Sequence, residues 1–445
     1  MLPAGLILLM MVMPGSPAIA QDQPAQPSTH LSDDSPSHQP VYPVSQQTIH
    51  PQLEEYLRIA SEDNPELRAL WHRYRSELEI VSQVGTLPDP EVNIGYSINP
   101  MMSESVLGRF SASAMQMFPW FGTLESRREV QRAASEAGLQ RLNSRQLELF
   151  RDIQFVWFDL TELQRQIDIA EMTIELVRDL EILVEARYET ARTGQADLLR
   201  IQMEEQRLQT MIANLEDRKN PVRARFNALL NRESDADVQT TDEIGPRMLP
   251  HTEEALKTRL LEQNPQFDQL DARGRMLREQ QNQSRLDGRP SFGLGLEVMG
   301  RDFGVMSMNP DMNESFIGMA TIRVPIYRAR YSAQYRQASE QLRGLDYERE
   351  QTRNMLLTEL EDALERFRES DRSVQLLNDE LIPRAEQAYE ILGDEYAAGN
   401  VRFDEVLQIQ RELLELELER IEALVRQNKA VIAIESITEE AAVSY

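Results

Sequence analysis

The chain has 445 residues, with 47 Lys and Arg against 74 Asp and Glu, a formal net charge of −27 and no cysteine. The missing cysteine excludes disulfides, Cys-ligated zinc, iron–sulfur clusters, thiol nucleophiles and lipidation on an N-terminal Cys. The acidic excess argues against a nucleic-acid partner, because too few cations remain to neutralise the phosphates.

Residues 1–20 predict a signal peptide. A short apolar run ends at Ala18-Ile19-Ala20, the small-x-small pattern that signal peptidase cleaves. Residues 21–50 are rich in Pro, Ser, Gln and Asp and predict a flexible N-terminal leader. No later stretch of 18 apolar residues follows. We therefore expect an exported protein without a transmembrane helix in its mature part.

The rest of the chain repeats itself with an offset near 200 residues. Asn-Pro-Glu-Leu at 64–67 corresponds to Asn-Pro-Gln-Phe at 264–267, and further similar segments follow in the same order. These matches predict two structural repeats, 51–240 and 241–445, each with a helix, a β-hairpin and a long helical hairpin.

Within each repeat the hydrophobic period changes in the same sequence. Val92, Ile94 and Tyr96 alternate with Asn93 and Gly95, a period of two that predicts a strand between two different environments. The predicted helices and strands are 53–83, 92–98, 110–118 and 124–191 in the first repeat, and 253–284, 292–298 and 316–324 in the second.

A long rod with heptad spacing follows each hairpin of strands. Ile153, Leu160, Ile167 and Ile174 recur every seven residues, which is typical of a coiled coil. About 65 residues at 1.5 Å each make a rod of roughly 100 Å. We expect the rods to reverse at residues 192–195 and 399–400, and Pro383 to bend the second one.

These patterns predict a mostly α fold with a small β part that one chain cannot complete. Four short strands would leave unpaired backbone groups at both sheet edges in lipid. A signal peptide, amphipathic strands and no apolar helix point to the bacterial outer membrane, where closed barrels are the rule. Closure must then come from several chains side by side, with the helices forming a wall beneath the barrel.

Three stretches give the chain a resemblance to the TolC-like outer-membrane efflux protein family, including its CzcC- and CusC-like heavy-metal branch. They are Leu-Pro-Asp-Pro at 87–90, Gln-Met-Phe-Pro-Trp-Phe-Gly at 116–122, and Tyr-Ala-Ala-Gly at 396–399 followed by Asp-Glu-Val-Leu at 404–407. The resemblance implies a tandem repeat and a homotrimer, with a twelve-stranded outer-membrane β-barrel (four strands per chain) continued by an α-helical coiled-coil tunnel in the periplasm.

The resemblance also implies a function and partners. Such a protein is the outer-membrane channel of a tripartite efflux system, with a periplasmic adaptor (membrane fusion protein) and an inner-membrane resistance–nodulation–division pump. It conducts substrates passively, heavy-metal cations among those implied, and it needs no cofactor and performs no catalysis. Outer-membrane lipid surrounds the barrel.

The resemblance assigns residues to a periplasmic gate and to an adaptor-docking turn. Tyr396, Gly399 and Glu405 match the family's tip pattern. The full set expected at the gate is Asp197, Tyr396, Gly399, Arg402, Asp404 and Glu405. The docking turn comprises Thr193, Gly194, Gln195 and Asn400. Separately, an aromatic belt at the membrane interface is expected from Phe118, Trp120, Phe121 and Tyr327.

Simpler structural roles for the tip residues remain open. Asp197 and Asp404 could be N-caps of the helices that follow them, and Gly194 and Gly399 fit left-handed helix stops. Aligned on these glycines, the first connection is three residues shorter than the second. Tyr188 is the less certain counterpart of Tyr396.

Two further alternatives concern metal and class of protein. The loop from Met306 to Met312, with Met101 and Met102, could contact soft Cu(I) or could simply pack. A periplasmic coiled-coil adaptor or scaffold without a channel is the alternative function. The chain lacks the G-x-S-x-G, P-loop and H-E-x-x-H motifs, so an enzyme is disfavoured.

Overall fold

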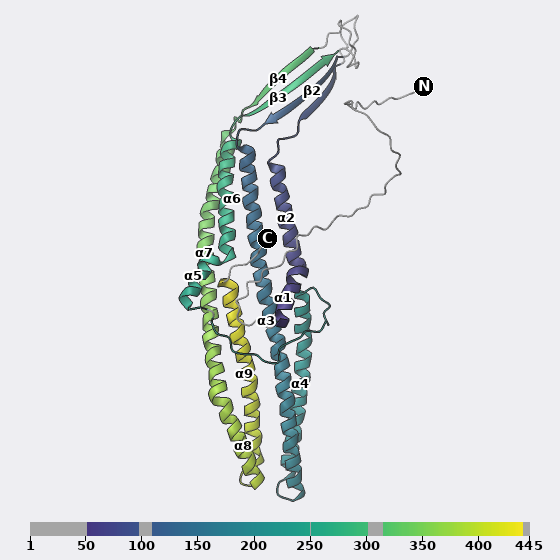
Figure 1. Cartoon of the computed structure of the whole chain (residues 1–445), viewed down its shortest axis with the longest axis vertical. Helices are drawn as coiled ribbons and strands as arrows, with labels where there is room; N and C mark the ends of the chain where they lie inside the picture. Colours follow the sequence, from purple (N-terminus) through teal and green to yellow (C-terminus); the bar gives the residue numbers. More distant parts are fainter. Residues whose placement is uncertain (1–50, 98–108, 250, 301–314, 439–445) are drawn as a thin grey trace, which may run out of the picture. The chain divides into compact units, whose positions relative to one another are not determined.

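The computed structural model describes residues 51–97, 109–249, 251–300 and 315–438. The predicted signal peptide, the leader and the methionine segments at 101–102 and 306–312 lie outside these residues. The described part is mostly helical with one four-stranded sheet (Figure 1), which confirms the predicted fold class. Among these residues, no helix is long and apolar enough to cross a membrane.

Both halves of the described chain run through the same order of elements. The first half contains α1 (Pro51–Asp63), α2 (Pro65–Val84), β1 (Glu91–Ser97), β2 (Arg109–Phe118), α3 (Thr123–Glu189) and α4 (Gln195–Leu229). The second contains α5 (Glu253–Gln263), α6 (Pro265–Asp287), β3 (Ser291–Gly300), β4 (Ser315–Arg323), α7 (Arg328–Leu376), the π-helical turn η1 (Leu377–Leu381), α8 (Ile382–Ala398) and α9 (Phe403–Thr438).

The helix predicted at the start of each half is in fact two helices, and an Asn-Pro pair divides them. Asn64 adopts an extended conformation, and its side-chain oxygen accepts hydrogen bonds from the N–H groups of Glu66 and Leu67 at 2.9 and 3.1 Å. Asn264 accepts from Gln266 at 3.0 Å in the same way. Proline disfavours helical geometry in the residue before it and suits the first helical position, so each pair ends one helix and starts another.

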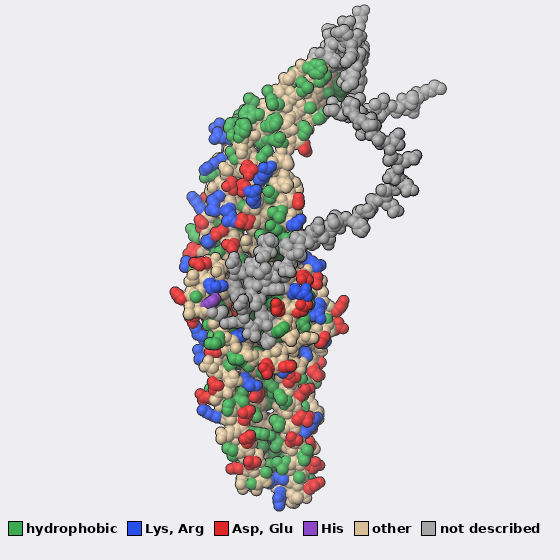
Figure 2. Space-filling model, viewed as in Figure 1, with side chains coloured by type: hydrophobic (Ala, Val, Ile, Leu, Met, Phe, Trp, Pro, Cys, Tyr) green, Lys and Arg blue, Asp and Glu red, His purple; other side chains and the backbone are tan. Residues whose placement is uncertain are grey.

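The sheet is antiparallel in the order β1-β2-β3-β4, so β1 and β4 each have one neighbour among the described strands. One face is apolar and exposed, with Val92 at 66% and Ile94 at 73% exposure. The other side chains of this face are Tyr96, Phe110, Ala112, Ala114, Gln116, Phe118, Phe292, Leu294, Leu296, Val298, Phe316, Ala320 and Ile322. Hydrophobic side chains gather over the sheet in Figure 2. The opposite face carries Ser, Asn, Thr, Glu, Gly, Arg and Met residues, together with Ile317.

The heptad pattern correctly identifies the buried side of α3. Ile153, Leu160, Ile167 and Ile174 are all buried, and they belong to hydrophobic clusters that α3 forms with α1, α4, α8 and α9. Trp157 is fully buried among them, and its indole N–H donates to the carbonyl of Gln239 at 3.0 Å. The core therefore follows the seam of the rod.

The second rod is interrupted where the first is continuous. α7 gives way to η1, and the N–H of Ile382 donates to the carbonyl of Leu377, five residues back. Pro383 follows at the start of α8. Because proline has no N–H and its ring crowds the preceding turn, a wider π-helical turn before it accommodates the ring.

Candidate functional site

The two helical hairpins meet at their tips around Tyr396. This side chain, near the end of α8, is 3% exposed, and its ring lies 5.5 Å from that of Phe403. The guanidinium of Arg187, near the end of α3, lies 4.6 Å from the Tyr396 ring centre. It also donates to the backbone carbonyls of Tyr396 and of Ala397, the latter at 3.1 Å. A cation of one hairpin therefore binds both the aromatic ring and the C-terminal carbonyls of the other.

Charged side chains form a second link beside this contact. Arg200 of α4 pairs with Asp197 of its own helix at 3.2 Å and with Asp404 of α9. Arg402 pairs with Asp404 at 3.0 Å, and its N–H donates to Glu405 at 3.4 Å. The structure thus brings together the predicted tip residues Asp197, Arg402, Asp404 and Glu405.

Sequence reasoning missed Arg187 and Arg200. The spacing of Asp197 and Arg200, three residues apart on a helix, could have predicted their ion pair. Nothing local could have predicted that Arg200 also reaches Asp404, which is 204 residues away in the sequence.

Burial raises the pKa of the Tyr396 phenol, although Thr193 and Arg187 act in the opposite direction. The phenol is therefore neutral across the physiological range. The Thr193 hydroxyl donates to Asp197 at 2.5 Å, which orients that carboxylate within the first connection.

Both Gly194 and Gly399 were predicted to be left-handed helix stops, and the structure confirms only Gly399. Gly399 has φ 87°, and the N–H of Asn400 donates to the carbonyl of Glu395 at 2.9 Å, which confirms a left-handed helix stop. Gly194 is extended, with φ −91°, so that prediction is wrong. Ala191 takes the left-handed conformation instead, at φ 54°, and the N–H of Arg192 donates to the backbone carbonyl of Arg187 at 2.8 Å.

This pattern corrects the comparison of the two connections. Gly399 corresponds to Ala191 and not to Gly194, so Tyr188 and Tyr396 occupy the same position of the motif. The first connection, residues 190–194, is not shorter than the second, residues 399–402. The apparent shortening came from aligning the wrong residues.

The two aspartates are not N-caps. Gly194 is the cap of α4, and Asp197 is the third residue of that helix. Asp404 is the second residue of α9. Both lie in a first turn, where a negative charge still interacts favourably with the helix dipole. Their carboxylates are free to pair with Arg200 because they do not cap the backbone.

The residues predicted to dock an adaptor lie in or beside the two connections. Gly194, Gln195 and Asn400 are exposed, and Thr193 is half-buried. Gln195 is the first residue of α4, and Asn400 follows the left-handed glycine.

The predicted aromatic belt lies at the junction between the strands and the rods. Phe121 and Tyr327 are 83% and 77% exposed. Trp120 lies 6.0 Å from Phe121 and 5.8 Å from Phe292, measured between ring centres. Phe118 ends β2 and is partly exposed. In sequence, these residues lie within four positions of the ends of β2 and β4.

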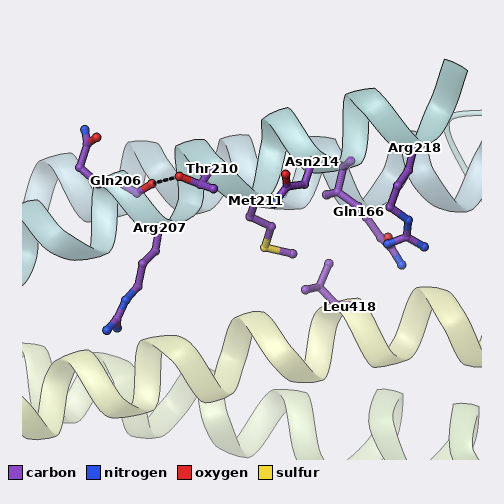
Figure 3. A pocket seen from close by; sticks show the side chains of 9 residues that line it. Gln166, Gln206, Arg207, Thr210, Met211, Asn214, Arg218 and Leu418 are labelled. Atoms are coloured by element: carbon purple, nitrogen blue, oxygen red, sulfur yellow. Dashed lines mark hydrogen bonds between the residues drawn. The ribbon is translucent and has the colours of Figure 1, made fainter.

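A groove of about 620 Å³ lies between the two hairpins (Figure 3), with Arg207 and Met211 of α4 facing Leu418 of α9. The buried carboxylate of Glu204 binds Arg411 of α9 at 2.9 Å and lies beside Arg207 at 3.3 Å. This ion pair joins the hairpins on the tip side of the groove, because Glu204 lies nearer to the start of α4 than the groove residues. Within the described ranges, no group of three or more His, Asp and Glu is placed to hold a metal.

Comparison with known proteins defines the class. The profile of the outer membrane efflux protein family matches residues 57–232 and again residues 256–439. The chain therefore belongs to the outer membrane efflux protein family, as the resemblance predicted.

Solved structures share the fold over most of the chain. CusC, from a study of its folding and transmembrane channel formation, is 17% identical with a TM-score of 0.74, covering 90% of this chain and 98% of its own. The outer-membrane channel OprN is 18% identical with a TM-score of 0.73, covering 87% and 90%. The outer membrane protein VceC of Vibrio cholerae is 13% identical with a TM-score of 0.71, covering 87% and 96%. No curated protein sequence matches the chain.

Proposed function

We propose that three copies of this chain join their sheets into a twelve-stranded outer-membrane barrel, which the helical hairpins continue as a tunnel into the periplasm. The channel conducts passively what an inner-membrane resistance–nodulation–division pump delivers through a periplasmic adaptor. The observation that carries the proposal is a four-stranded sheet with an exposed apolar face and single-neighbour strands at both edges.

The physical argument concerns the sheet edges. Unpaired backbone groups cost several kcal/mol each in hydrocarbon, so β1 and β4 require partners there. Edge strands of neighbouring copies supply those partners, and closure removes every edge. Val92, Ile94 and the rest of the apolar face then contact lipid, and the polar face lines the lumen. The exposed rings of Phe121 and Tyr327 suit the membrane interface.

The tip contacts suit a closed gate. Arg187 holds the end of α8, and Arg200 holds Asp404, so both links tie one hairpin to the other. Threefold symmetry repeats Asp404 and Glu405 around the axis, and such carboxylate rings favour cations. The exposed turn residues Gly194, Gln195 and Asn400 form the surface that an adaptor would contact.

Assembly is tested on the full-length protein extracted from outer membranes. We expect a trimer by light scattering, co-sedimentation with outer-membrane markers on sucrose gradients, and channels in planar bilayers. A soluble monomer without conductance would contradict the proposal and favour a scaffold.

The gate is tested by replacing Asp404→Ala and Glu405→Ala together. Exposed ion pairs contribute about 0.5 kcal/mol each, so three copies shift the closed-to-open ratio roughly tenfold, and closed-state conductance should rise. The matched control is Glu340→Ala with Asp346→Ala, which removes the same charge from exposed positions of α7. Equal conductance in the two double variants would remove Asp404 and Glu405 from the gate.

A further inference from the structure

All four methionines of the described strands lie on the same face of the sheet. Met115 is in register with Gly295, which is in register with Met319. Met117 is in register with Gly293, and Met299 with Ser111. Residues in register share a face, so these thioethers lie among Ser, Asn, Thr, Glu and Gly on the face opposite the apolar side chains.

This distribution is not what hydrophobic packing alone predicts. A flexible apolar side chain such as Met would fit the lipid-facing side, where Phe, Leu, Ile and Val are found. The alternation of the strands instead places every Met on the face where the other residues, apart from Ile317, are small, polar or charged. Met117 is 8% exposed, and Met115, Met299 and Met319 are half-buried.

The sulfur atoms of Met115 and Met117 converge over one glycine. A Cβ added at Gly293 would lie 2.5 Å from the Met117 sulfur and 3.6 Å from the Met115 sulfur. The hydroxyl of Thr321 in β4 lies 3.8 Å from the Met115 sulfur. Any side chain at residue 293 would occupy this space, so the glycine is what allows two thioethers to share it.

Two carboxylates accompany the thioethers. Glu91 is in register with Met115, and Glu297 lies on the same face, two residues from Gly295 in β3. Two arginine positions belong to this face as well: Arg323 at the end of β4, two residues beyond Thr321, and Arg109 at the start of β2. Soft sulfur ligands with nearby negative charge favour soft monovalent cations over Mg²⁺ or Ca²⁺.

From the convergence of Met115 and Met117 over Gly293, with Met319 on the adjacent strand, we infer a thioether site for Cu(I) or Ag(I) on the inward face of the barrel sheet. The lumenal position rests on the proposed trimeric channel, whereas the ligand set rests on the sheet alone. A channel site must release its ion, and neutral thioethers suit weak, exchangeable binding.

The probe is Ag⁺ as its nitrate, measured by equilibrium dialysis on the purified full-length protein. Met101, Met102, Met306, Met308 and Met312 are first replaced by Leu, so that the methionines between β1 and β2 and between β3 and β4 do not contribute. In this background we expect saturable Ag⁺ binding. Met115→Leu with Met117→Leu should lower the affinity at least tenfold, because Leu keeps the volume and removes the sulfur.

The matched control is Met172→Leu with Met203→Leu, two exposed methionines of the rods. This control should bind Ag⁺ like its background. Circular dichroism and thermal melting verify that both double variants are folded. Unchanged Ag⁺ affinity in the folded Met115/Met117 variant would overturn the inference.

Conductance separates this inference from the proposed function. Ag⁺ should reduce the single-channel current of the background protein, and the Met115/Met117 variant should resist at least tenfold more Ag⁺. A conducting protein without Ag⁺ binding refutes the metal site and leaves the channel standing. Methionine-dependent Ag⁺ binding by a protein that forms no channel supports the ligand set and refutes the channel.

Discussion

The two halves of this chain repeat one order of elements, yet their rods and tips differ in ways that separate fold from function. α3 runs without interruption from Thr123 to Glu189, whereas the second rod is α7, a π-helical turn and α8. Tyr188 and Tyr396 occupy the same position at the two tips, but Tyr188 is exposed and Tyr396 is buried. The first half supplies Arg187, and the second half supplies the ring that this cation covers.

The difference between the rods is one of hydrogen-bond regularity. A continuous helix resists bending, whereas a π-helical turn next to a proline already lacks regular hydrogen bonds. The buried Tyr396 and the ion pairs of Asp404 both belong to the half with the interrupted rod. The contacts of Tyr396 and Asp404 therefore join the interrupted rod of the second half to the hairpin of the first half.

The largest expected effect comes from introducing a proline into the continuous rod of the first half, compared with removing Pro383 from the second. Glu175 precedes Tyr188 by as many residues as Pro383 precedes Tyr396, and its side chain is exposed. Glu175→Pro should destabilise the protein by about 3 kcal/mol or more, because it removes a hydrogen bond inside a continuous helix. Pro383→Ala should change stability by about 1 kcal/mol or less. Thermal melting by circular dichroism measures both.

Glu175→Ala is the control for side-chain loss and should stay within about 0.5 kcal/mol. If Pro383→Ala destabilised the protein as much as Glu175→Pro, this would contradict the view that the π-helical turn accommodates the proline ring without a large loss of stability.

A smaller effect, equal in the two halves, is expected when the equivalent capping residues Asn64 and Asn264 are replaced. Besides capping the helix that follows, Asn64 donates to the carbonyl of Leu229 at 2.9 Å, and Asn264 donates to that of Ile437 at 2.9 Å. Each therefore ties the beginning of its half to the end of the same half. Asn64→Ala and Asn264→Ala should each cost about 2 kcal/mol, from a lost cap and an unpaired buried carbonyl.

Asn354→Ala, at an exposed helical position, is the control and should leave the melting temperature nearly unchanged. A large effect at only one of the two capping asparagines would show that this link between the beginning and the end of a half is not equally important in both halves.

The smallest effects, opposite in sign, are expected at the tips. Ala191→Gly should stabilise the protein by about 0.5 kcal/mol, because alanine at φ 54° is strained. Gly399→Ala should destabilise it by about 1 kcal/mol, since φ is 87° there. Melting curves of the two variants, each compared with wild type, provide the measurement. Shifts of the same sign would contradict the equivalence of Ala191 and Gly399.

Much of the local structure could be predicted from the sequence. The seven-residue period identified the buried face of α3, and the alternation of Val92, Ile94 and Tyr96 identified the exposed face of β1. The turns failed in detail because Ala191, which has no left-handed preference, takes the conformation expected of Gly194. Tertiary contacts across the tip outweigh a local preference of about 1 kcal/mol.

The residues of the candidate site were likewise predicted only in part. Asp197, Arg402, Asp404 and Glu405 were predicted and do come together, but their partner Arg200 was not. The methionines of the sheet were visible in the sequence, whereas their convergence over Gly293 depends on the register of β2 against β3.

The sequence by itself determined which side of the long helix α3 is buried and where the strands and rods lie. These features depend on backbone periodicity and on steric preferences of neighbouring residues. Only the tertiary structure decided that Arg187 covers Tyr396, that Arg200 reaches Asp404, and that two thioethers meet above one glycine. Residues some 200 positions apart meet only once both halves are packed, and no local preference encodes that distance.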